Sequence, residues 1–189
     1  MAQPVQFSGL MNATIQLGGT FDNPTGNGSL EITEGTVAGA GFDRALAMLT
    51  MKDGFIHLDQ MLAERDIYKL TASGDIPLDL FRVKGQRKDP NAQMNINVDF
   101  NEASLAALSA FDFVEWGTGD TKGKLNITGT LDNPQLFGSL SVENGSLKVR
   151  YLNNVIDNIN MDVAFDGSVV NVRNLSARMG QGFVAGGGT

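Results

Sequence analysis

Aliphatic residues occupy every second position over much of this chain, and this alternation is the feature that most restricts its fold. From 94 to 100, Met, Ile, Val and Phe alternate with asparagine and aspartate. From 159 to 165, four apolar residues again alternate with smaller or polar ones. Successive side chains of a β-strand point to opposite faces, so this period of two is typical of strands with one apolar face. The sequence therefore predicts an all-β chain.

Short dipeptides separate the alternating runs. Asn-Gly and Asp-Gly supply the positive φ angles that a type I′ hairpin turn needs. We therefore expect hairpin turns at four places: Glu34-Gly35, Asp53-Gly54, Asn144-Gly145 and Asp166-Gly167.

One segment departs from the period of two. Leu105, Leu108 and Phe111 are spaced three apart and would share one stripe of a helix. Asn101 is a suitable N-cap, and the segment is rich in alanine, the best helix former. The spacing predicts a short helix near 102–111.

A twelve-residue segment occurs twice in the chain in closely similar form. GTFDNPTGNGSL, from Gly19 to Leu30, returns 110 positions later as GTLDNPQLFGSL, from Gly129 to Leu140. Because proline fixes its own φ and holds the preceding residue extended, Asp132-Asn133-Pro134 is expected to be a turn into the next strand. Further along, Leu49 and Met51 are expected to correspond to Ile159 and Met161.

Internal repetition at a fixed offset indicates units that extend one continuous core. The first unit is predicted to span 9–118, and 119–189 is predicted to be an incomplete second unit. We expect 1–189 to be a single fragment of a longer repeating β domain, because the second copy of the repeat is cut off.

Composition excludes some classes of partner. Hydrophobic residues make up 42% of the 189 positions, which is enough to bury a substantial apolar surface, and 23 glycines favour many tight turns. The net charge of -7 disfavours nucleic acid, whose phosphates would be repelled, and docking onto an anionic membrane surface. The chain has no cysteine, so disulfides and thiolate chemistry are excluded.

About a dozen strands with one apolar face each must hide that face from water. A barrel would do so, although a barrel does not naturally carry a unit that repeats end to end. A two-sheet sandwich would also do so, with the apolar residues packed against each other. The third solution is a long curled sheet, roughly 60 Å long at ~4.8 Å per strand, whose apolar face lines an open groove.

An open apolar groove of that length exceeds the exposed patches that monomers usually tolerate. It would need a partner or an apolar ligand such as an acyl chain. At ~0.8 kcal/mol per buried methylene, one long acyl chain would gain on the order of 10 kcal/mol.

The pattern GxLxITGTLDNPxxxGSLxVxNGxL, from Gly123 to Leu147, resembles the C-terminal region of TamB proteins, within the wider AsmA-like group of envelope proteins. The earlier copy at 13–37 fits the same pattern. The family is also similar to this chain in three shorter segments: 71–75, 116–119 and 184–187. The resemblance implies a long curled sheet, the β-taco, with an apolar interior.

The resemblance also implies a setting and partners. The parent protein would be anchored in the inner membrane, outside this fragment, and would cross the periplasm of a diderm bacterium. It would be associated with moving phospholipid towards the outer membrane and with an outer-membrane barrel partner of the TamA type. The resemblance carries no catalytic motif, and we expect neither an enzyme nor a cofactor.

The apolar positions of the alternating runs are therefore the candidate lipid-binding residues. We predict that the groove is lined by Ile15, Leu17, Leu30, Ile32, Leu70, Ile76, Leu78, Ile96, Val98, Phe100, Leu125, Ile127, Leu140, Val142, Leu147, Val149, Ile159, Met161, Val163 and Phe165.

Motifs for catalysis or metal binding are weak. Gly123-Lys124 lacks the other glycine and the hydroxyl residue of a phosphate-binding loop. His57 is the only histidine, and the chain has no cysteine, so the sequence disfavours a transition-metal site. It also disfavours a catalytic triad, because no nucleophile motif surrounds His57. Asp132-Asn133 and Asp157-Asn158 match no EF-hand spacing and are ordinary turn formers.

Two further groups of side chains each allow two interpretations. The basic cluster Lys84, Arg87 and Lys88 could meet a lipid headgroup or form a solvated loop. Four methionines could line an adaptable pocket or fill gaps in a core: Met48, Met51, Met61 and Met161.

Two functional hypotheses follow. In the first, the chain is a segment of a periplasm-spanning apolar groove that carries phospholipid between inner and outer membrane and supports outer-membrane assembly. In the second, it is a non-catalytic β-rich scaffold that binds an outer-membrane barrel protein by strand addition at an exposed edge.

Overall fold

The computed structural model of the chain describes residues 7–20, 23–37, 40–66, 68–81, 89–104 and 114–189. These residues form eleven strands that lie in the sheet in the order of the sequence, each antiparallel to the next. The strands are β1 (Phe7–Gly19), β2 (Pro24–Val37), β3 (Ala40–Lys52), β4 (Phe55–Arg65), β5 (Tyr68–Pro77), β6 (Gln93–Ser104), β7 (Val114–Thr130), β8 (Asn133–Val149), β9 (Ile156–Gly167), β10 (Val169–Met179) and β11 (Gly182–Gly188).

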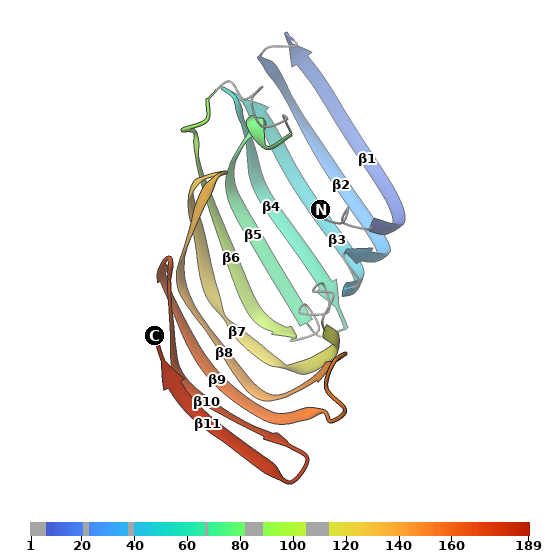
Figure 1. Ribbon diagram of the computed structural model, residues 1–189. Coiled ribbons are helices and arrows are strands. Elements are labelled where there is room, and N and C mark those ends of the chain that lie inside the picture. The colour runs from blue at the N-terminus through green and yellow to red at the C-terminus, as the bar shows by residue number, and fades with distance from the viewer. Residues whose placement is uncertain (1–6, 21–22, 38–39, 67, 82–88, 105–113) are drawn as a thin grey trace.

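The sheet is a single open layer. Figure 1 shows the eleven strands side by side in one curved surface, with β1 and β11 at its two opposite ends. The all-β prediction is confirmed, and within the described residues the sheet neither closes into a barrel nor folds into a two-sheet sandwich. At ~4.8 Å per strand, the sheet measures about 48 Å from β1 to β11.

The predicted helix near 102–111 is not found where the chain is described. Glu102 to Ser104 belong to β6, where Ala103 and Ser104 pair with Thr121 and Asp120 of β7. Pairing with the neighbouring strand thus overrides the helical propensity of these residues. The remainder of that segment, 105–111, lies outside the described residues.

The helical structure of the described residues is one 3-10 turn, η1 (Leu78–Phe81). Leu78 was expected to continue the alternation of β5, but it belongs to this turn instead, because the strand ends at Pro77. Proline cannot donate to the next ladder of hydrogen bonds, which favours a strand end there. Over the same described residues, no helix is long and apolar enough to cross a membrane.

Two of the four predicted hairpin turns are confirmed. Asp53 and Gly54 connect β3 to β4, and their φ angles of 54° and 81° are those of a type I′ turn. Asp166 pairs with Val169 across the turn between β9 and β10, in which Gly167 has φ 67°. The turn expected at 132–134 lies slightly earlier: Leu131 and Asp132 connect β7 to β8, and Asn133 and Pro134 are already paired in β8.

The other two predicted turns are wrong. Glu34-Gly35 and Asn144-Gly145 lie inside β2 and β8, and each dipeptide forms a β-bulge opposite one glycine of the preceding strand. Those glycines are Gly9 and Gly119, and a side chain on either would collide with the bulge. The dipeptide does supply the expected positive φ, 50° at Glu34 and 49° at Asn144, but the strand continues through it.

The hairpins β1–β2 and β7–β8 share one backbone geometry. Every register pair between β1 and β2 recurs between β7 and β8 at an offset of 110, from Phe7↔Val37 to Gly19↔Pro24. In both turns a threonine hydroxyl accepts a hydrogen bond from the asparagine backbone N–H, at 3.0 Å in Thr20–Asn23 and 3.2 Å in Thr130–Asn133.

The correspondence does not extend at this offset to the next strand. Leu30 pairs with Ala47 of β3, whereas Leu140 pairs with Val163 of β9, which is 116 positions further along than Ala47. The sheet register therefore places the counterparts of Leu49 and Met51 six positions after the expected Ile159 and Met161. The full repeat unit 9–118 and the incomplete unit 119–189 remain a prediction.

Candidate functional site

The register of the sheet brings the predicted groove residues to one face. Directly opposed residues of neighbouring antiparallel strands point to the same side of a sheet. One line of such pairs crosses the sheet from β1 to β8, and each member is aliphatic or glycine: Ile15, Gly28, Leu49, Leu58, Gly74, Ile96, Ile127 and Leu136.

A second line runs across the C-terminal half, from β5 to β10. Its members are Leu70, Phe100, Gly123, Leu140, Val163 and Val172. The pairings and the strand alternation place the other predicted residues on the same side, except Leu78 in η1. We call this side of the sheet the apolar face.

Burial on the apolar face differs between strands. Val142, Ile159 and Ala177, from β8, β9 and β10, are 3–8% exposed and pack with Leu147, Ile156 and Met161. On the outer strands the aliphatic side chains are open: Ile15 is 60% exposed in β1, and Val184 is 52% exposed in β11. The apolar face is thus packed around β8 to β10 and exposed at both ends of the sheet.

Several residues of the apolar face were not predicted. A register shift between Leu58 and Met61 changes the parity of β4, so Leu58 and Met61 share the face although they are three apart in the sequence. Small residues are also hard to assign by hydropathy. The residues missed include Met11, Ala13, Ala45, Ala47, Leu49, Met51, Ile56, Leu58, Met61, Leu136, Val172 and Ala177.

Thr121 interrupts the apolar face with a hydroxyl group. It pairs with Val142 and is only 6% exposed. Its Oγ1 has no hydrogen-bond partner within the described part of the chain. Burial of such a group is unfavourable, so this position is not explained by packing alone.

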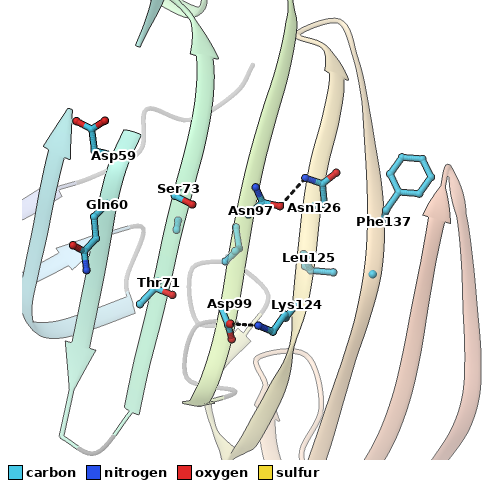
Figure 2. Close-up of a pocket in the computed structure, with 13 residues that line it drawn as sticks. Asp59, Gln60, Thr71, Ser73, Asn97, Asp99, Lys124, Leu125, Asn126 and Phe137 are labelled. Atoms are coloured by element: carbon cyan, nitrogen blue, oxygen red, sulfur yellow. Dashed lines mark hydrogen bonds and ion pairs between the residues drawn. The ribbon is translucent and has the colours of Figure 1, made fainter. Parts of the chain in front are cut away.

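The opposite face of the sheet carries polar side chains, and many of them line an open hollow of about 660 Å³. The lining also includes Ala72, Val98, Leu125 and Gly138, whose positions belong to the apolar face. Figure 2 shows side chains of β4 to β8 that line it, with Phe137 at one side. Asn126 Nδ2 donates to the Oδ1 atoms of Asn95 and Asn97, at 2.7 and 2.9 Å. Lys124 Nζ lies 2.7 Å from Asp99 Oδ2.

These polar groups join neighbouring strands to one another. The amide ladder links β6 to β7, and the Lys124–Asp99 pair is an exposed ion pair of the kind that contributes about 0–1 kcal/mol. Cross-strand pairs of this type are a regular means of stabilising a sheet. Sheet pairing therefore accounts for the polar contacts around the hollow, and we take the apolar face, which contributes Val98 and Leu125 to it, as the candidate binding site.

The residues considered for metal binding or catalysis do not assemble into a site. His57 Nδ1 lies 2.6 Å from Asp75 Oδ1 on the directly paired strand, and both side chains are partly exposed on the polar face. In the described ranges no three His, Cys, Asp or Glu residues gather as a metal site would need. The basic cluster at 84, 87 and 88 lies outside the described residues.

The described residues thus form an open antiparallel sheet with one largely apolar face. Residues 62–173 match the family model of the TamB C-terminal domain. The match spans more than half of the chain, so the chain belongs to the TamB C-terminal domain family. No curated protein and no solved structure matches the chain.

Proposed function

We propose that the apolar face binds the acyl chains of phospholipids, as one segment of a groove that spans the periplasm of a diderm bacterium. Membership of the TamB family supports a role in an envelope-spanning module for outer-membrane assembly and translocation. In this proposal the parent protein is anchored in the inner membrane and meets an outer-membrane barrel of the TamA type.

The observation that carries the proposal is the line of aliphatic and glycine residues that crosses the sheet without a polar member from Ile15 to Leu136. No described element of the chain forms a second layer over this face. Apolar surface of this extent is usually covered in a soluble protein. An acyl chain supplies that cover and would gain on the order of 10 kcal/mol.

Aliphatic side chains also suit movement along the sheet. They form no directional bonds, so an acyl chain can slide from one strand to the next without breaking a hydrogen bond. The headgroup stays in water at the open margin of the face, because burying a charged phosphate without a partner is strongly unfavourable. The groove is thus proposed to act passively, with no chemical step.

Native mass spectrometry of the purified chain tests lipid binding. We expect adducts with the masses of phospholipids that are released by collisional activation or by detergent. A chain that stays monomeric and soluble but is free of lipid, both as purified and after incubation with phospholipid vesicles, would contradict the proposal.

A further inference from the structure

Two neighbouring turns at one margin of the sheet carry exposed apolar side chains. They are the turn that follows β8 and the turn that follows β10, and Figure 1 shows both at the lower right. The turns lie side by side, since a Cβ atom on Gly180 would be 3.2 Å from Asn154 Nδ2. Tyr151 is 83% exposed, Leu152 is 36% exposed and Met179 is 40% exposed.

Lys148 connects the only tryptophan of the chain to this margin. Its register partner in β7 is Trp116, which is 40% exposed. Lys148 Nζ donates to the backbone carbonyl oxygens of Leu152 and Asn153, at 2.7 and 3.0 Å. The ammonium group thus holds the turn in the conformation that leaves Tyr151 exposed.

Most of the charges at this margin are cationic. Arg150 is exposed and makes no hydrogen bond or ion pair within the described part of the chain. Lys148 caps the turn, and Arg178 lies opposite the carboxylate of Asp157 in the register. The other carboxylate here is Glu115, which is adjacent to Trp116 in the sequence. We call Trp116, Arg150, Tyr151, Leu152 and Met179 the aromatic margin.

The turns at the other margin of the sheet are acidic. The turns β3–β4, β7–β8 and β9–β10 contain Asp53, Asp132 and Asp166. Lys52 is the neighbouring cation, and its Nζ lies 3.7 Å from Asp53 Oδ2. Val169, which follows the last of these turns, is 47% exposed. An exposed apolar residue can therefore be compared at the two margins.

The apolar face reaches the sheet margin at the aromatic margin. Leu147 pairs with Ile156, and Ile156 pairs with Met179, so one apolar row lies directly behind the two turns. Leu147 and Ile156 also pack against the buried cluster of β8, β9 and β10. Exposed aromatic rings, an unpaired guanidinium group and the apolar face are thus continuous with one another.

We propose that the aromatic margin docks onto the surface of a phospholipid bilayer. Tyrosine and tryptophan favour the boundary between headgroups and acyl chains, because their rings are apolar and each carries one polar group. The guanidinium of Arg150 is suited to lipid phosphate, which arginine binds with two parallel hydrogen bonds. Every phospholipid carries that phosphate, so docking does not need an anionic bilayer and is compatible with the net charge of -7. The docking goes beyond the proposed function, because it does not require lipid on the apolar face.

Flotation of the whole chain with phosphatidylcholine vesicles tests the docking. We expect the chain to float with the vesicles and the emission of Trp116 to shift to shorter wavelengths. We also expect brominated phosphatidylcholine to quench this emission. Trp116 lies opposite Lys148 on the polar face, so quenching reports contact at the aromatic margin and not at the apolar face.

Matched variants locate the docking surface. Tyr151→Asp and Val169→Asp each place a carboxylate at an exposed apolar residue next to a turn, on opposite margins. We expect the first to weaken vesicle binding by about tenfold or more and the second to leave it unchanged. Circular dichroism is the control for folding.

The phospholipid that co-purifies with the chain separates docking from the proposed function. We expect Tyr151→Asp to retain it while losing vesicle binding, since Tyr151 lies outside the apolar face. Docking at this margin would be contradicted by an absence of flotation, by flotation without a change in Trp116 emission, or by equal effects of the two variants.

Discussion

Replacing Ile127 with aspartate is expected to remove bound phospholipid from the chain, whereas replacing its neighbour Thr128 with aspartate should leave the lipid in place. Ile127 is half-buried on the apolar face, between Ile96 of β6 and Leu136 of β8. A carboxylate at an acyl-chain contact costs about 3 kcal/mol, which corresponds to a loss of roughly 100-fold in affinity. Thr128 pairs with Asn95 and Gln135 on the opposite face.

The comparison is matched because both substitutions add the same charge to adjacent residues of one strand. Bound phospholipid is measured after solvent extraction and is expressed per folded chain, with circular dichroism as the control for folding. Equal lipid content in the two folded variants would show that the apolar face is not where lipid binds.

Replacing Gly138 with alanine is expected to destabilise the sheet by about 3 kcal/mol or more. The φ angle of Gly138 is 122°, which L-residues rarely adopt, and a Cβ atom there would collide with the carbonyl oxygen of Lys124 in β7. The two strands would have to separate locally, in a region where they are fully paired.

Gly74 and Gly123 are constrained in the same way as Gly138. Their φ angles are 139° and 152°, and a Cβ atom would meet the carbonyl oxygens of Asn95 and Ser139. Glycines of this kind allow a sheet to bend, so we attribute part of the curvature in Figure 1 to them.

Urea unfolding followed by circular dichroism measures the effect. Gly186→Ala is the control, because an added Cβ atom at Gly186 has nothing within 4 Å. We expect a large fall in the unfolding midpoint for Gly138→Ala and little change for the control. An unchanged midpoint for Gly138→Ala would mean that β7 and β8 can adjust to a side chain at this position.

The alternation of the sequence was sufficient to predict the all-β fold and to bring all of the predicted groove residues except Leu78 to one face, although it missed other residues of that face. It worked because the period of two is a direct consequence of strand geometry, and because an unclosed antiparallel sheet in sequence order keeps partners local in the chain. Val98, Leu125 and Phe165 were assigned by alternation alone, and the register places all three on one side.

The bulges could not be predicted in the same way. Asn144-Gly145 supplies a positive φ both in a hairpin turn and in a bulge, so the dipeptide defines a local angle and not a reversal of the chain. Only the pairing of β8 with β7 and β9 shows that the strand continues to Val149. The register shift at Leu58 likewise depends on β5 and leaves no mark in the sequence of β4.

Photocrosslinking along β8 tests most directly whether lipid lies on the apolar face. A photoreactive residue is placed in turn at positions 136, 139, 140 and 141, where Ser139 and Ser141 lie on the polar face and the half-buried Leu136 and Leu140 lie on the apolar face. We predict crosslinks to phospholipid from positions 136 and 140 and none from 139 and 141. Crosslinks without this alternation, or only from the serine positions, would contradict binding at the apolar face.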